Sequence, residues 1–131
     1  MKTLIVEDDF TSRLLLQEIL KPYGPSHVAV NGREAVEAVR LALEANEPYD
    51  LICLDIMMPE MDGQAALKDI RAQEEARGIL SSKGAKIVMT TALGDIRNVS
   101  AAYNSLCDGY LTKPIQKAKL LEELRTLKLI S

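Results

Sequence analysis

"DLICLDIMMPEMDG", residues 50–63, carries an aspartate, Asp55, to the end of an apolar run and then turns sharply. Residues 51–54 are all apolar, which is typical of a short strand that is buried on both faces. Pro59 and Gly63 follow closely, so the chain leaves this strand through a turn. An aspartate in such a place is usually a helix cap or a solvated strand end. The remainder of the chain has to show whether Asp55 does chemistry.

Five short apolar runs alternate with helical patterns along the chain. The runs are rich in Val, Ile and Leu and too short for independent helices, as expected of buried strands. They span residues 3–6, 27–30, 50–54, 86–90 and 109–112. The stretches after them place apolar residues three and four positions apart, at Phe10, Leu14, Leu16 and Leu20; Val36, Val39 and Leu43; Leu67 and Ile70; Ile96, Val99 and Tyr103; and Leu120, Leu124 and Leu127. This alternation predicts an α/β fold, a single (βα)5 doubly wound parallel five-stranded sheet, with residues 1–131 as one domain.

Composition and charge narrow the class of protein. The net charge is −3 and no basic patch is present, so we expect no direct nucleic-acid partner and no membrane-surface partner. No apolar run reaches the roughly 18 to 20 residues that span a bilayer, and the start "MKTLIVEDD" turns acidic too soon for a signal peptide. Cys53 and Cys107 lie in apolar stretches and are expected to be buried thiols in a reducing compartment. These features predict a cytoplasmic protein.

Polar residues stand at the carboxyl ends of four of the predicted strands. In a doubly wound sheet these ends meet at one rim, where ligands bind. Carboxylates crowded together repel each other unless a cation lies among them, and oxygen ligands with room for water suit Mg²⁺. A lysine and a hydroxyl at the same rim then face an anion bound against the metal, for which phosphoryl oxygens are suitable. The polar residues are Glu7, Asp8 and Asp9; Asp55; Thr91, which Ala92 follows; and Lys113.

Four motifs, "LIVEDD", "LDIMMPEMDG", "MTTA" and "GYLTKP", extend this pattern over nearly the full length. With them the chain resembles a response-regulator receiver domain, the phosphoacceptor module of two-component signalling, and in particular single-domain chemotaxis regulators. The resemblance implies a flavodoxin-like receiver fold with strand order 2-1-3-4-5. It places the first and fifth helices on one face of the sheet and the other three on the opposite face. It also implies a cis peptide between Lys113 and Pro114.

The resemblance assigns a metal site to the acidic residues. Asp55 is the expected acceptor of a phosphoryl group from a histidine kinase or a histidine phosphotransfer protein. Asp8 is expected to ligate Mg²⁺ directly together with Asp55 and the carbonyl of Met57, and Glu7 mostly through water. Because three acids run together, the acidic pair is either Glu7 and Asp8 or Asp8 and Asp9. A strand that ends at Val6 favours the first register and leaves Asp9 as a helix N-cap.

The resemblance also assigns residues to the phosphoryl group and to a switch. Lys113 is expected to pair with the phosphate, and the backbone N–H groups of Met57 and Ala92 to bind its oxygens. Thr91 corresponds to the switch hydroxyl and Tyr110 to the switch aromatic. Phosphorylation would then change the face formed by helix 4, strand 5 and helix 5. We expect an unknown downstream protein to read this face, in a monomer or a phosphorylation-dependent dimer.

The predicted function is therefore a phosphoacceptor signalling domain. It catalyses only its own phosphorylation and slow dephosphorylation, so it is not an enzyme with an external substrate. One alternative is a receiver fragment of a longer regulator whose output domain is missing. Another is an aspartyl-phosphate phosphatase of the haloacid dehalogenase type, which needs a second aspartate where this chain has Met57.

Three further interpretations concern His27, the charge run of residues 72–78, and the side chains of Met57 and Leu93. His27 is interpreted as a surface or structural histidine. The charge run "AQEEARG", residues 72–78, is interpreted as a solvated helix face. The resemblance implies that the positions of Met57 and Leu93 flank the path of an attacking water. Neither side chain can orient water by a strong hydrogen bond, so the phosphorylated state is predicted to be long-lived.

Overall fold

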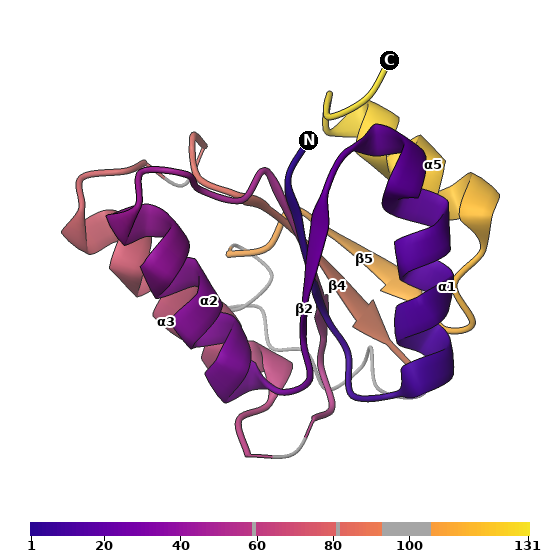
Figure 1. Ribbon diagram of the computed structural model, residues 1–131, viewed down its shortest axis with the longest axis horizontal. Coiled ribbons are helices and arrows are strands. Elements are labelled where there is room, and N and C mark those ends of the chain that lie inside the picture. The colour runs from indigo at the N-terminus through magenta and orange to yellow at the C-terminus, as the bar shows by residue number, and fades with distance from the viewer. Residues whose placement is uncertain (59, 81, 93–105) are drawn as a thin grey trace.

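The computed structural model describes residues 1–58, 60–80, 82–92 and 106–131 (Figure 1). Its strands form one parallel five-stranded sheet in the order β2-β1-β3-β4-β5, which confirms the predicted fold and strand order. The strands are β1 (Thr3–Val6), β2 (Ser26–Ala29), β3 (Leu51–Asp55), β4 (Lys86–Thr91) and β5 (Gly109–Thr112). The helices are α1 (Phe10–Leu20), the 3-10 turn η1 (Lys21–Tyr23), α2 (Gly32–Glu44), α3 (Gly63–Ala76) and α5 (Lys117–Thr126). The predicted fourth helix, around residues 96–103, lies outside the described residues.

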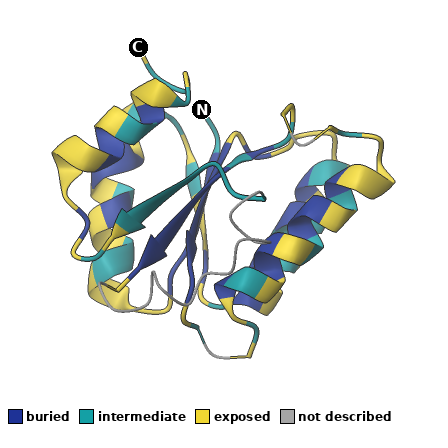
Figure 2. Cartoon of the chain, turned by 180° about the vertical axis from the view of Figure 1, so that it is seen from behind, coloured by how far each residue is buried: buried dark blue, intermediate teal, exposed yellow. Residues whose placement is uncertain are grey.

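The helices form two layers around the sheet, with α1 and α5 on one face and α2 and α3 on the other (Figure 1). Alternate residues of β1 enter different cores, because Leu4 packs with α2 and α3 whereas Ile5 packs with α1 and α5. Both residues are fully buried, and the strands in the middle of the sheet are dark from end to end in Figure 2. Burial on both faces explains why these strands are almost continuously apolar.

The ends of three strands differ slightly from the prediction. β2 begins and ends one residue earlier than expected, β3 begins and ends one residue later and so includes Asp55, and β4 is one residue longer and includes Thr91. Asp55 pairs with Thr90 of β4, and the next amide, that of Ile56, donates to the Thr90 carbonyl at 3.0 Å. Strand ends depend on the hydrogen bonds that neighbouring strands offer, which apolar runs do not reveal. The two polar residues are therefore held by the sheet itself.

Helix α1 turns only some of its apolar residues to the core. Leu16, Ile19 and Leu20 are buried, whereas the side chains of Phe10 and Leu14 are 66% and 47% exposed. Phe10 and Leu14 lie four residues apart and so share one face, which is turned away from the three buried residues. The apolar spacing indicated the helix but did not decide which of these residues face the core, because the run of leucines is compatible with either face.

The charge run of residues 72–78 is also not wholly solvated. Glu74 is only 4% exposed and accepts a hydrogen bond from Arg71, itself 7% exposed, at 2.7 Å. Glu74 follows Ile70 by four residues and Leu67 by seven, which places it on the buried face of α3. Arg71 and the Ala85 amide both donate to its carboxylate, so the buried side chain has hydrogen-bond partners.

Smaller predictions have mixed outcomes. His27 Nδ1 lies 2.8 Å from the Tyr49 hydroxyl, as expected of a structural histidine. Cys53 is buried as predicted, but Cys107 is only half-buried, and neither forms a disulfide within the described residues. None of the described helices combines the length and the apolar character that a membrane span requires.

Candidate functional site

The three acidic residues after β1 divide into two groups. Asp9 caps α1, because its carboxylate accepts hydrogen bonds from the Ser12 amide at 2.9 Å and the Ser12 hydroxyl at 2.8 Å. These hydrogen bonds hold the pKa of Asp9 below its usual value. Glu7 continues the line of β1, and its amide donates to the Ala29 carbonyl at 3.0 Å. Glu7 and Asp8, and not Asp9, are thereby left beside the end of β3.

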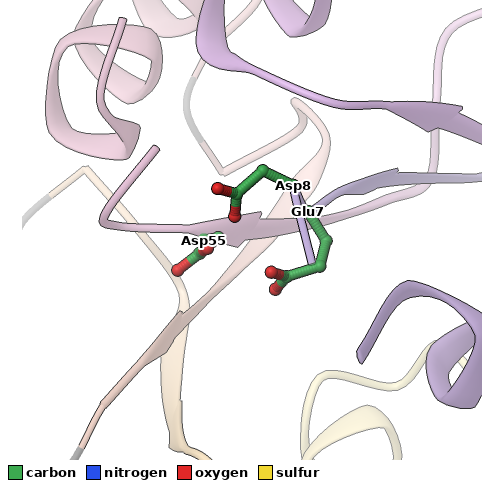
Figure 3. A group of neighbouring side chains, drawn as sticks. All are labelled: Glu7, Asp8 and Asp55. Atoms are coloured by element: carbon green, nitrogen blue, oxygen red, sulfur yellow. The ribbon is translucent and has the colours of Figure 1, made fainter. Parts of the chain in front are cut away.

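Glu7, Asp8 and Asp55 converge at the carboxyl end of the sheet (Figure 3). Each offers a carboxylate oxygen, and these three oxygens lie within 4.8 Å of one another. Glu7 and Asp55 are buried, whereas Asp8 is exposed to solvent. Three carboxylates so close together repel one another, which costs stability unless a cation balances them.

Lys113 is the cation that the protein itself brings to this cluster. Its backbone amide donates to the Thr91 carbonyl at 2.8 Å, and its peptide bond to Pro114 is cis, as the resemblance implied. Its Nζ donates to Glu7 Oε1 at 3.1 Å and lies 2.9 Å from Glu7 Oε2 and 3.2 Å from Asp55 Oδ2. One lysine thus stands between two buried carboxylates.

The pKa values show that Lys113 does not fully balance the negative charge of the carboxylates. Burial, and then the neighbouring charge of Glu7, raise the pKa of Asp55 to about 7, although Lys113 acts in the opposite direction. Burial by itself lowers the pKa of Lys113, but the hydrogen bond to Glu7 and the charge of Asp55 outweigh it and raise that pKa. The site therefore still lacks positive charge.

The donor set fits a hard divalent cation. All the side-chain ligands are carboxylate oxygens, which Mg²⁺ prefers together with water. The buried Glu7 Oε2 has the Lys113 ammonium 2.9 Å away and no further hydrogen bond from the described residues, so it retains a lone pair for a cation or a metal-bound water. Asp8 is open to solvent, which leaves room for coordinated water.

The backbone beside Asp55 is close-packed. The Met57 amide points at Asp55 Oδ1 from 3.4 Å, while the Met57 side chain is 63% exposed. The Gly63 amide donates to the Ile56 carbonyl at 2.8 Å. A Cβ atom at Gly63 would lie only 2.1 Å from the Asp55 carbonyl oxygen, so this position requires glycine. The sequence predicted Gly63 only as part of a turn. Its position shortly after Asp55 in the chain is the one signal that could have indicated its close approach to the Asp55 carbonyl.

The proposed switch residues lie on β4 and β5. Thr91 is buried at the end of β4, and its hydroxyl donates to the Ala92 carbonyl at 3.2 Å. Tyr110 pairs with Met89 in the sheet and is half-buried against the core on the side of α2 and α3. Burial and a hydrogen bond with Cys107 raise the pKa of Tyr110, so its hydroxyl stays protonated at neutral pH. Leu93 lies outside the described residues.

Comparison with known proteins identifies the family of this arrangement. The family model of the response regulator receiver domain matches residues 3–125. The chain belongs to this family. Receiver domains are signalling modules of two-component systems, and this chain shares their fold and their acidic cluster.

Two curated relatives illustrate the range of the family. The chain is 35% identical over 125 residues to the chemotaxis protein CheY of Bacillus subtilis, covering 94% of this chain and 93% of CheY. It is 36% identical over 122 residues to the sensor protein GacS of Pseudomonas syringae pv. syringae, covering 92% of this chain but only 13% of GacS. The chain also spans 12% or less of three other sensor or hybrid histidine kinases that it matches.

Two solved structures are informative about the site. The receiver domain of the sensor histidine kinase PA1611 from Pseudomonas aeruginosa has a magnesium ion coordinated in its active-site cleft. It superposes with a TM-score of 0.74 at 27% identity, covering 97% of each chain. The receiver domain of Ssk1 from Saccharomyces cerevisiae, solved with the histidine phosphotransfer protein Ypd1, gives a TM-score of 0.79 at 28% identity, covering 99% of this chain and 92% of that one.

Proposed function

We propose that residues 1–131 form a receiver domain that accepts a phosphoryl group on Asp55 in a Mg²⁺-dependent reaction. The observation that carries this proposal is the convergence of three carboxylates with Lys113, whose Nζ lies 3.2 Å from Asp55 Oδ2. Asp55 is buried at the end of a central strand and is held in place by the sheet. A nucleophilic carboxylate needs this rigidity because it must meet the phosphorus in line.

In the proposed reaction, an ionised Asp55 oxygen attacks the phosphorus of a phosphohistidine. The P–O bond forms as the P–N bond breaks, and the leaving imidazole nitrogen keeps the electron pair and takes a proton from solvent. Lys113 moves its ammonium group from the carboxylates to the phosphoryl oxygens, and the Met57 and Ala92 amides donate to the same oxygens. When bound by Glu7, Asp8, Asp55 and the Met57 carbonyl, Mg²⁺ supplies the positive charge that favours ionised Asp55 and neutralises the phosphoryl group. Water later hydrolyses the acyl phosphate slowly.

The exposed apolar face at the start of α1 suits the phosphoryl donor. Phe10 follows the acidic cluster directly, and Leu14 and Leu15 continue this exposed surface. We propose that a histidine kinase or a histidine phosphotransfer protein docks here, as the complex of the similar Ssk1 receiver with Ypd1 suggests. Phe10→Ser should slow transfer from a phosphorylated histidine phosphotransfer protein but leave labelling by acetyl phosphate unchanged. Equal rates of transfer from the protein donor to Phe10→Ser and to the unaltered protein would contradict this docking site.

Output is proposed to run through Thr91 and Tyr110. The phosphoryl group would draw the Thr91 hydroxyl towards itself, and the Tyr110 side chain would fill the space that the hydroxyl leaves. The face formed by helix 4, β5 and α5 would change as a result, and a downstream protein or a dimer partner would bind the changed face. Amide exchange should therefore change at β5 and α5 when beryllofluoride and Mg²⁺ are added. A change restricted to the acidic cluster would contradict the switch.

We also propose that the protein is located in the cytoplasm. Its two cysteines form no disulfide within the described part of the chain, which suits this reducing compartment.

The experiment that tests the central proposal is labelling by acetyl phosphate with Mg²⁺, followed by mapping of the modified residue. We expect one phosphoryl group on Asp55, and no labelling after chelation of the metal. Asp55→Asn should remain folded but unlabelled. Full labelling of this variant would overturn the assignment of Asp55.

A further inference from the structure

The β3–α3 loop, which follows Asp55, is held at two points. At its base, the Gly63 amide donates to the Ile56 carbonyl at 2.8 Å. At its outer side, the carbonyl of Met61 accepts a hydrogen bond of 3.0 Å from the amide of Gly32, the first residue of α2. The described residues of this loop include Met57, whose amide faces Asp55 Oδ1. A displacement of Met61 would therefore move the loop backbone at Met57, which we propose binds the metal and the phosphoryl group beside Asp55.

Gly32 reaches Met61 because it has no side chain. A Cβ atom at Gly32 would lie 2.2 Å from the Met61 carbonyl oxygen and 2.9 Å from both the Met61 carbonyl carbon and its Cβ. These are backbone atoms and the first atom of a side chain, so no rotamer change can relieve the overlap. Gly32 has no positive φ, which means that close approach, not backbone conformation, is what requires glycine here.

The first turn of α2 is itself firmly placed. Asn31 caps the helix by accepting the Glu34 amide at 2.8 Å. Gln73 of α3 donates to the Val36 carbonyl at 3.1 Å and ties the two helices together. The Gly32 amide is one of the donors that a helix start leaves without an intrahelical acceptor, and here it is aimed at the loop instead of at solvent. Arg33 adds only a long, exposed ion pair of 3.7 Å to Glu60, which contributes little.

We propose that Gly32 is a positioning residue for the phosphorylation site, which through Met61 holds the β3–α3 loop where Met57 can serve the metal and the phosphoryl group. Gly32 contacts neither ligand and acts only through the loop. This inference rests on the proposed function of Asp55, and it adds a residue on a different helix to the machinery of the site.

The test is Mg²⁺ binding by isothermal titration calorimetry on Gly32→Ala, together with the initial rate of labelling by acetyl phosphate. Residues that support metal ligands typically change metal affinity by about 10-fold or more, and we expect about 10-fold weaker Mg²⁺ binding and slower labelling. Alanine is a better helix former than glycine, so a general weakening of α2 is not expected to cause this loss.

Two control variants separate positioning from general destabilisation. Gly78→Ala strains a residue with φ of +75° but meets no atom within 4 Å, so it should lower stability while leaving Mg²⁺ affinity unchanged. Arg33→Ala removes the exposed ion pair to Glu60 and keeps the Gly32 hydrogen bond, so it should also bind Mg²⁺ normally. If Gly32→Ala binds Mg²⁺ as the unaltered protein does, or if Gly78→Ala loses the same affinity, the inference is overturned.

A second measurement needs no variant. If the loop and the metal support each other, Mg²⁺ should slow hydrogen exchange of the Gly32 amide in the unaltered protein, by about threefold or more at saturation. An unchanged exchange rate at Gly32 would overturn the inference even if Gly32→Ala failed to fold. Unaltered protein that binds Mg²⁺ but is never labelled on Asp55 would instead overturn the proposed function.

Discussion

The two ends of the sheet each hold a cluster of charges that includes buried residues, and the clusters are built in opposite ways. At the amino ends of β4 and β5, Arg71 donates to Glu74, to Asp108 and to the carbonyls of Ala85 and Leu106, at 2.7–2.9 Å. The two carboxylates also accept backbone amides, that of Ala85 on Glu74 and that of Ile87 on Asp108. Nearly every polar atom in this cluster has a partner of good geometry.

The acidic cluster at the carboxyl ends is left incomplete. Lys113 pairs with two of the three carboxylates, those of Glu7 and Asp55, and the pKa of Asp55 is raised to about 7. The comparison indicates that the charges that stabilise the fold and the charges that serve the proposed function lie at opposite ends of the sheet. A saturated cluster fastens α3 to β4 and β5, whereas the unsaturated one is where we propose that a cation and a phosphoryl group bind.

The largest expected effect breaks the saturated cluster. Arg71→Met should leave the buried Glu74 and the half-buried Asp108 without their cation and lower the free energy of unfolding by about 3 kcal/mol. Urea denaturation monitored by circular dichroism measures this change. Arg40→Met, which removes only exposed ion pairs to Glu37 and Glu44, is the matched control and should change stability far less. Similar losses in both variants would mean that the Arg71 cluster contributes no more than a surface pair.

The next effect is a pH dependence that comes from the acidic cluster. Because the folded state holds the proton of Asp55 up to about pH 7 and the unfolded state only up to about pH 4, the folded state binds more protons in between. Stability without metal should therefore fall as the pH rises from about 4 to about 7. The pKa difference sets a limit of about 4 kcal/mol, and relaxation around the site should leave about 2 kcal/mol.

Asp55→Asn is the variant that tests this pH dependence. It should lack the fall in stability and be more stable than the unaltered protein at pH 8 without metal. Saturating Mg²⁺ should remove most of the difference, since binding at about 100 times Kd stabilises the folded state by about 2.7 kcal/mol. If the two proteins show parallel stability profiles between pH 4 and pH 8, the raised pKa of Asp55 is wrong.

A smaller effect distinguishes the neighbouring acids after β1. Asp8→Ala should weaken Mg²⁺ binding by about 10-fold or more, because it removes a proposed direct ligand. Asp9→Ala should bind Mg²⁺ nearly normally and lose a little stability, because it removes the cap that accepts the Ser12 amide and hydroxyl. Metal titration and thermal denaturation of both variants give the comparison. A larger loss of affinity at Asp9 would show that the acidic pair is shifted by one residue.

The smallest expected effect concerns the lifetime of the phosphorylated state. The exposed Met57 side chain offers only a weak acceptor to an attacking water, so Met57→Asn should speed the loss of phosphate by about threefold. The decay of labelled protein after removal of acetyl phosphate measures this rate. Equal decay in both proteins would show that Met57 does not limit access of water.

The sequence by itself determined the alternation of strands and helices and the polar residues at the strand ends. Both follow from local rules, since apolar periodicity distinguishes a strand from a helix and the carboxyl ends of parallel strands meet at one rim. Glu7, Asp8, Asp55, Thr91 and Lys113 could therefore be assigned to one edge without coordinates. The strand order and the cis peptide before Pro114 came from the resemblance to a family.

Only the tertiary structure decided which polar groups are buried and what they contact. Lys113 meets Glu7 across 106 residues of chain, and Arg71 meets Asp108 across 37. The face of α1 that leaves Phe10 exposed, and the contact of Gly32 with Met61, likewise depend on elements far apart in sequence. The physical reason is that local sequence indicates only the conformational preferences of each residue. Burial and close approach depend on two surfaces in contact, and the second surface comes from a distant part of the chain that folding brings near.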